Sequence, residues 1–128
     1  MREILFRGKR LDNGKWIEGD LKHDDLDFDT DIVYIYFHNK IEGRYETAEV
    51  DPATVGQYTG LKDINGKRIF EGDIVKTVYK TGCVEYCEKQ ARYNIYLKSK
   101  DRLNEMNFMK NMANECEVIG NIHDEVKP

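Results

Sequence analysis

Residues 60 to 67 come closest to a motif of known chemistry, because Gly60 and Gly66-Lys67 approach a phosphate-binding loop. Five residues separate the two glycines where the motif requires four, and Arg68 stands where a Ser or Thr would hold magnesium. A hairpin turn at Asn65-Gly66 accounts for the second glycine without any ligand. We therefore expect no nucleotide and no other cofactor at this loop.

Three aspartates of an acidic stretch have the spacing of the first, third and fifth ligands of a calcium loop: Asp27, Asp29 and Asp31. Ile32 replaces the glycine that the sixth position needs, and His38 replaces the glutamate of the twelfth, which excludes an EF-hand. We interpret residues 24–31 as a solvated loop, because so many like charges repel one another in a strand. Weak cation binding by this loop stays open as the alternative.

Four soft metal ligands lie in the C-terminal half of the chain: Cys83, Cys87, Cys116 and His123. Cys83 and Cys87 have three residues between them on an expected strand, which lacks the turn that brings two thiolates to one zinc ion. We expect no metal site. Because three cysteines cannot all pair, they are interpreted as reduced thiols of a cytoplasmic protein.

Acid-base or nucleophilic catalysis has no candidate pair in the sequence, since the three histidines are scattered and none accompanies a nucleophile. An enzyme would need a pocket in which Asp73, His123 or the acidic loop converge. We therefore predict no catalytic residues and favour a protein without enzymatic activity.

A weak basic bias marks residues 76–110, which hold 8 basic and 4 acidic side chains, within a chain of net charge −4. By contrast, residues 1–59 hold 8 basic and 13 acidic side chains, a balance of −5. Tyrosines alternate with the basic residues, as in surfaces that neutralise phosphates and stack bases. Candidate nucleic-acid contacts are Lys76, Lys80, Arg92, Tyr96 and Lys98. Core tyrosines beside a solvated basic edge are the favoured alternative.

The composition predicts that strands position these residues, because eight Tyr and five Phe accompany only two Pro. Asn13-Gly14 lies between two strand-like runs and predicts a two-residue type I′ hairpin turn. Residues whose numbers sum to 27 then face each other, which places Arg7 opposite Asp20. Asn65-Gly66 predicts a second hairpin of the same kind, with Asp63 opposite Arg68.

Hydrophobic patterns predict the remaining elements. Residues 32–37 are expected to form a buried strand, a turn follows at 38–40, and Asp51-Pro52 ends the partner strand. Other strands are expected near 44–50, from 74 onward, around 84–86, around 93–97 and at 118–122. Leu103 and Met106 begin a spacing of three to four residues, which predicts an amphipathic helix near 101–114.

The domain organisation that we predict has two lobes in one compact unit, with β-hairpins at residues 1–52 and a second lobe of strands at 53–128. No run of 18 or more apolar residues is present, and charge returns at Arg7 before a signal-peptide core could form. We expect a protein that is neither exported nor membrane-spanning and that acts in the cytoplasm.

Several phrases occur together in a fixed order: Arg2-Glu3-Ile4 with Phe6-Arg7, Thr54 to Leu61, Asp63 to Lys67, Ile69 to Val75, and Glu117 to Ile122. In this combination the chain resembles the YopX family of small phage and prophage proteins, from residue 2 to about 124. The resemblance implies a mainly β protein whose C-terminal part is an SH3-type small barrel, with no assigned activity. The residues that match recurrent family positions are interpreted as turn and strand-entry residues: Gly60, Gly66, Gly72, Asp73 and Gly120.

Together these observations predict a mainly β fold with one short helix, and a phage or prophage accessory protein that acts by binding. The expected partner is a protein or a second copy of the chain, through exposed strand edges or the methionine-bearing helix. The alternative is nucleic-acid binding by the small barrel through the Lys76–Arg102 region.

Overall fold

The computed structural model describes residues 3–23, 32–77, 81–89, 91–98, 103–106 and 115–124, with the backbone alone at 96–98 and 103–106. The chain divides into two compact units, unit 1 (Met1–Tyr58) and unit 2 (Thr59–Pro128). The described residues form antiparallel strands and one short 3-10 turn, so the prediction of a mainly β protein is confirmed. No helix in the described part of the chain could span a membrane.

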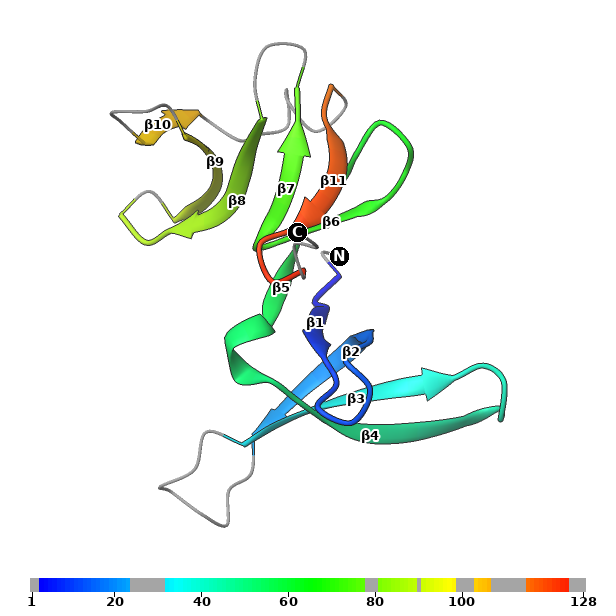
Figure 1. The fold of residues 1–128 in the computed structure, drawn as a ribbon. Helices are drawn as coiled ribbons and strands as arrows, with labels where there is room; N and C mark the ends of the chain where they lie inside the picture. Colours follow the sequence, from blue (N-terminus) through cyan, green and yellow to red (C-terminus); the bar gives the residue numbers. More distant parts are fainter. Residues whose placement is uncertain are drawn as a thin grey trace. The chain divides into compact units, whose positions relative to one another are not determined.

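Unit 1 is an antiparallel sheet in the order β4-β3-β2-β1-β5 (Figure 1). Its elements are β1 (Phe6–Lys9), β2 (Trp16–His23), β3 (Val33–Asn39), β4 (Arg44–Val50), the 3-10 turn η1 (Pro52–Thr54) and the start of β5 (Gly56–Lys62). The predicted strand near 44–50 and the break at Asp51-Pro52 are confirmed. The boundary that we predicted between the two lobes, after residue 52, lies at the start of η1. This boundary stays a prediction.

The ends of β1 and β4 in this sheet also meet each other. Arg10 forms an antiparallel bridge with Val50, and the backbone N–H of Asp51 donates to the carbonyl of Lys9 at 2.8 Å. A side chain at Gly8 would begin 3.1 Å from Val50, so the absence of one lets the fully buried Val50 approach β1. The contact closes unit 1 around a core of Val33, Ile35 and Val50.

Strand β2 changes partner along its length. Residues 16–19 pair with β1 and residues 20–23 pair with β3. Gly19 lies at this change, where a Cβ atom would overlap the carbonyl oxygen of Tyr36. A glycine is needed here because the backbone of β3 crosses it closely.

The β1–β2 turn has four residues instead of the two that Asn13-Gly14 predicts. The backbone N–H of Arg10 donates to the carbonyl of Lys15, and only Gly14 of the pair has positive φ, at 69°. A type I′ turn needs positive φ at both positions, so the predicted register is wrong. Arg7 faces Glu18 instead of Asp20. The shift is two residues, so every side chain keeps its predicted face.

Unit 2 contains a five-stranded antiparallel sheet in the order β10-β9-β8-β7-β11, and the end of β5 pairs with β6 (Figure 1). Its strands are β6 (Arg68–Phe70), β7 (Asp73–Lys76), β8 (Thr81–Cys87), β9 (Arg92–Lys98), β10 (Leu103–Met106) and β11 (Glu117–Asn121). Its core consists of Ile69, Val75, Val84, Ile95, Cys116 and Val118.

The β5–β6 turn also differs from the predicted one. The backbone N–H of Asp63 donates to the carbonyl of Lys67 at 2.8 Å, and that of Gly66 donates to the carbonyl of Asp63 at 3.0 Å. The loop therefore has three residues and ends on Gly66, with φ of 77°. Asp63 faces Lys67, so the predicted pairing with Arg68 is wrong.

The helix predicted near 101–114 is wrong at residues 103–106, which form β10 against the edge of β9. The remaining residues of that range lie outside the described part of the chain. The four residues 103–106 begin and end with an apolar side chain, a pattern that fits a strand as well as a helix. The open edge of β9 offers backbone hydrogen bonds, and these favour the strand.

Candidate functional site

The loop whose sequence partly matches a phosphate-binding motif forms the β5–β6 turn. The side-chain carboxylate of Asp63 occupies the position that a phosphate would take. Oδ1 of Asp63 accepts hydrogen bonds from the backbone N–H groups of Asn65 and Lys67, each at 2.9 Å. Oδ2 accepts a third from the N–H of Val118, also at 2.9 Å. The turn therefore directs its N–H groups at its own side chain instead of at a phosphate.

These hydrogen bonds decide the charge of Asp63. Burial acts to raise the pKa of its carboxyl, but the backbone N–H groups of Val118, Lys67 and Asn65 outweigh burial, and the pKa is lowered from its usual value. Asp63 is thus an ionised structural acceptor that ties the turn to β11, 55 residues away in sequence.

Asp73 is a second buried carboxylate with a similar task. Its Oδ2 accepts from the backbone N–H of Phe70 at 2.8 Å, and its Oδ1 accepts from the side-chain amide of Asn121 at 3.0 Å. The Asn121 oxygen in turn accepts from the backbone N–H of His123 at 2.9 Å. Asp73 and His123 thus lie at opposite ends of a structural chain of hydrogen bonds. The acidic loop, the third group of the enzyme hypothesis, lies outside the described residues.

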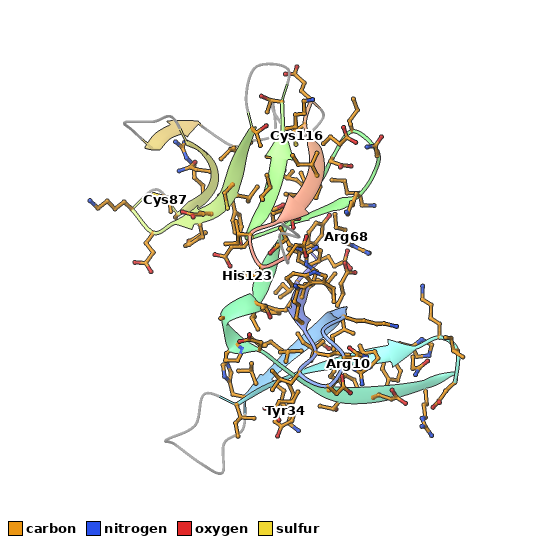
Figure 2. All side chains as sticks on the ribbon, in the orientation of Figure 1. Arg10, Tyr34, Arg68, Cys87, Cys116 and His123 are labelled. Carbon is orange, nitrogen blue, oxygen red and sulfur yellow. The ribbon has the colours of Figure 1, made fainter. Side chains whose placement is uncertain are left out.

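The cysteines stay separate along unit 2. Cys83 and Cys87 are half-buried on β8, and Cys116 is fully buried just before β11 (Figure 2). Burial, and then the charge of Asp63, raise the pKa of the Cys116 thiol. Within the described ranges, no three His, Cys, Asp or Glu side chains are placed to hold a metal ion.

The candidate nucleic-acid residues are only partly described. Lys76 is exposed and pairs with Thr81 on β8, whereas Arg92 pairs with Cys87 at the far end of the same strand. Six residues of a strand span about 20 Å, so Lys76 and Arg92 do not converge. Backbone register places Tyr96 opposite Cys83 and Lys98 opposite Leu103. Lys80 lies outside the described residues.

Unit 1 carries an exposed aromatic surface, and part of it comes from the run at 32–37 that was predicted to be a buried strand. Ile35 is fully buried, but Tyr36, on the other face of β3, is 43% exposed. The register places Tyr36 between Asp20 of β2 and Thr47 of β4. The predicted buried strand is therefore present, but it is buried on one face only.

Three rings meet on this outer face. Tyr36 and Tyr45 stack with their centroids 5.2 Å apart and their planes 7° from parallel. His38, directly opposite Tyr45 in the register, packs against it at 4.9 Å and 59°. Tyr45 is 62% exposed. We call Tyr36, His38 and Tyr45 the tyrosine stack; its rings hold one another in place while their outer surfaces stay accessible.

The same face carries a tryptophan with cations over its ring. Lys9 pairs with Trp16 in the β1–β2 register. The guanidinium of Arg7 lies 4.5 Å from the Trp16 ring centroid, and the ammonium of Lys9 lies 5.3 Å from it. Both distances are within the range of a cation–π interaction.

Carboxylates flank the tyrosine stack. Asp20 is opposite Tyr36, and Glu49 is opposite Tyr34 of the neighbouring row. Both acids are exposed, and Lys22 lies on the other side of Tyr34. We call the outer face of β1–β4 the aromatic face; it is defined by Trp16, Asp20, Tyr36, His38, Tyr45 and Glu49.

A signal for this face was present in the sequence. Along β3, the apolar residues Val33, Ile35 and Phe37 alternate with Tyr34, Tyr36 and His38. This period of two predicts one face toward the core and one toward solvent. The expectation of a buried strand treated Tyr34 and Tyr36 like their apolar neighbours, although each carries a hydroxyl group that favours water.

By its fold and this face, the chain is an antiparallel β protein of two units, and its N-terminal sheet exposes aromatic side chains. Residues 5–127 match the family model described as "YopX protein", and the chain therefore belongs to the YopX family, as its resemblance predicts. Among solved structures it is similar to protein EF1440 from Enterococcus faecalis, with a TM-score of 0.53 and 22% identity, covering 96% of this chain and 95% of that one. This likeness concerns the fold alone. No curated protein matches the chain.

Proposed function

We propose that this YopX-family chain is a phage or prophage accessory protein that acts by binding another protein through the aromatic face. The observation that carries the proposal is the stack of Tyr36 on Tyr45, exposed by 43% and 62%. Tyrosine and tryptophan are enriched at protein interfaces and contribute much of their binding energy. Because the rings are already packed together, little side-chain entropy is lost when a partner covers them.

The buried polar groups of unit 2 support a role without catalysis. Asp63 and Asp73 accept hydrogen bonds that hold β11, and Asn121 is bound between Asp73 and His123. A catalytic carboxylate needs access to a substrate, whereas Asp73 is fully buried. Cys83, Cys87 and Cys116 are thiols and not disulfides in the described structure, which supports a reducing cytoplasm of the bacterial host as the place of action.

The test is a comparison of three tagged baits in extract of the host cell. These are the natural chain, the Tyr36→Ser/Tyr45→Ser double variant, and Tyr86→Ser as a matched control, since Tyr86 is 45% exposed on unit 2. We expect a specific partner to be retained by the natural chain and by the control, and lost by the double variant. A partner held equally by all three baits contradicts the proposal.

A second proposal concerns nucleic acid and rests on Lys76, which is exposed at the end of the unit 2 sheet where Lys98 also lies in the backbone register. The candidate contacts remain Lys76, Lys80, Arg92, Tyr96 and Lys98. An SH3-type barrel would present them to single-stranded DNA or RNA. Salt-dependent binding that weakens in Lys76→Ala and Lys98→Ala variants is the expected result, with a smaller loss in Arg92→Ala because Arg92 lies at the other end of β8. No binding at low salt would end this proposal.

A further inference from the structure

We infer that the partner segment that covers the tyrosine stack is a positively charged peptide, rich in arginine or lysine. This inference rests on the proposed function and names the chemistry of the partner. The stack would hold a guanidinium or ammonium group over a tyrosine ring, and the neighbouring carboxylates would pair with it.

The chain already shows this type of contact on the same face. Arg7 and Lys9 place their cations 4.5 Å and 5.3 Å from the ring centroid of Trp16. At the tyrosine stack, no cation of a described residue lies over Tyr36 or Tyr45. At Trp16 the aromatic face thus has cations from the chain's own side chains, whereas at the tyrosine stack the rings are exposed.

Acidic side chains make the second part of the argument. Residues directly opposite in a sheet share one face, about 5 Å apart, so a cation over Tyr36 lies within reach of Asp20. Neither Asp20 nor Glu49 forms an ion pair with a described residue. Both are exposed and available to a partner.

The charge of the N-terminal half favours the same occupant. Residues 1–59 carry 13 acidic and 8 basic side chains, a balance of −5, which attracts a cationic segment and repels phosphate groups. A nucleic acid stacked on the tyrosines would bring its phosphates toward Asp20 and Glu49. A purely apolar segment would leave the same carboxylates without partners as they lost water.

The experiment measures fluorescence anisotropy of labelled peptides with the full chain. The probes are an arginine-rich peptide, its glutamate-substituted counterpart and a single-stranded oligothymidine. We expect binding of the arginine-rich peptide alone, weakening with salt. Tyr36→Leu/Tyr45→Leu keeps apolar area but removes the rings, and should weaken binding roughly tenfold.

Two further variants separate a contact from a change in fold. Tyr36→Phe keeps a ring face and should retain most of the affinity, while Asp20→Asn should weaken binding and reduce its salt dependence. Glu88→Gln, an exposed acid of unit 2, is the charge control and should bind as the natural chain does.

Equal peptide binding by the double leucine variant, no peptide binding at low salt, or a preference for oligothymidine would each overturn the inference. Light scattering that shows a dimer dissociated by Tyr36→Leu would also overturn it, because a second copy would then cover the stack. If the serine double variant still loses its partner in host extract while the peptide does not bind, the proposed function stands and the inference alone fails.

Discussion

The two units hold their sheets together by different interactions. In unit 1, backbone hydrogen bonds join the ends of β1 and β4, and Gly8 leaves the space that the apolar side chain of Val50 fills, so the closing contact depends on steric fit. In unit 2, the ionised Asp63 and the buried Asp73 accept hydrogen bonds from β11 and so hold a strand from the far end of the chain. A sheet closed by steric fit leaves the polar and aromatic residues of its outer face available for binding. In a sheet closed by carboxylates, those carboxylates are occupied by structural hydrogen bonds and are not available to a ligand.

The largest effect that tests this comparison is expected from Asp63→Ala. The substitution leaves three backbone N–H groups without their acceptor, and we expect a loss of about 3 to 5 kcal/mol in the free energy of unfolding of unit 2. Urea unfolding followed by circular dichroism measures the loss. Asp12→Ala, an exposed acid paired with Arg10 in unit 1, is the control. Equal midpoints for both variants would show that β11 is held by other contacts.

Gly19→Ala probes steric fit in unit 1. Its new methyl group would overlap the carbonyl oxygen of Tyr36, so β2 or β3 must shift, at a cost of about 2 to 4 kcal/mol. Gly120→Ala in unit 2 meets nothing nearer than 3.7 Å and should cost less. Thermal unfolding of the two variants makes the comparison. A larger loss for Gly120→Ala would reverse the roles assigned to the two units.

Acid should weaken unit 2 through Asp63. Its pKa is lower in the folded protein than the ordinary value of 3.8, so the ionised form favours folding. This contribution is complete above the ordinary pKa and is lost as the pH falls through the folded-state pKa. Urea midpoints measured from neutral pH down to about pH 2 should fall for the natural chain and change less for Asp63→Asn. Parallel pH curves for the two proteins would refute the assignment.

The smallest effect concerns the thiols. Burial and the charge of Asp63 raise the pKa of Cys116, which lowers its thiolate fraction, while Cys83 and Cys87 are half-buried. A disulfide reagent at mildly alkaline pH should therefore modify Cys116 last. Mass spectrometry of the labelled peptides gives the order. Early labelling of Cys116 would mean that the core of unit 2 opens readily.

Much of the fold could be predicted from short-range patterns. The strand near 44–50, the break at Asp51-Pro52 and the final strand near 118–122 are all present. The hairpins were predicted in place but not in register, because an Asn-Gly pair is compatible with turns of several lengths. In the first turn, the side chain of Asn13 accepts from the N–H of Lys15, which favours the longer loop.

The candidate site was harder to predict. The tyrosine stack joins residues of two strands, and a stacked pair is apparent only when the register is known. Asp63 resembled part of a ligand loop because its acceptor role depends on Val118, far along the chain. The basic residues suggested a surface, but Lys76 and Arg92 lie toward opposite ends of β8.

Local sequence decided where this chain turns and which residues alternate, because backbone conformation at Gly14, Gly66 and Pro52 depends on near neighbours alone. Tertiary structure decided which carboxylates became structural and which tyrosines stayed exposed. Those outcomes depend on strands that lie far apart in sequence, and their hydrogen bonds and contacts exist only after the sheets have assembled.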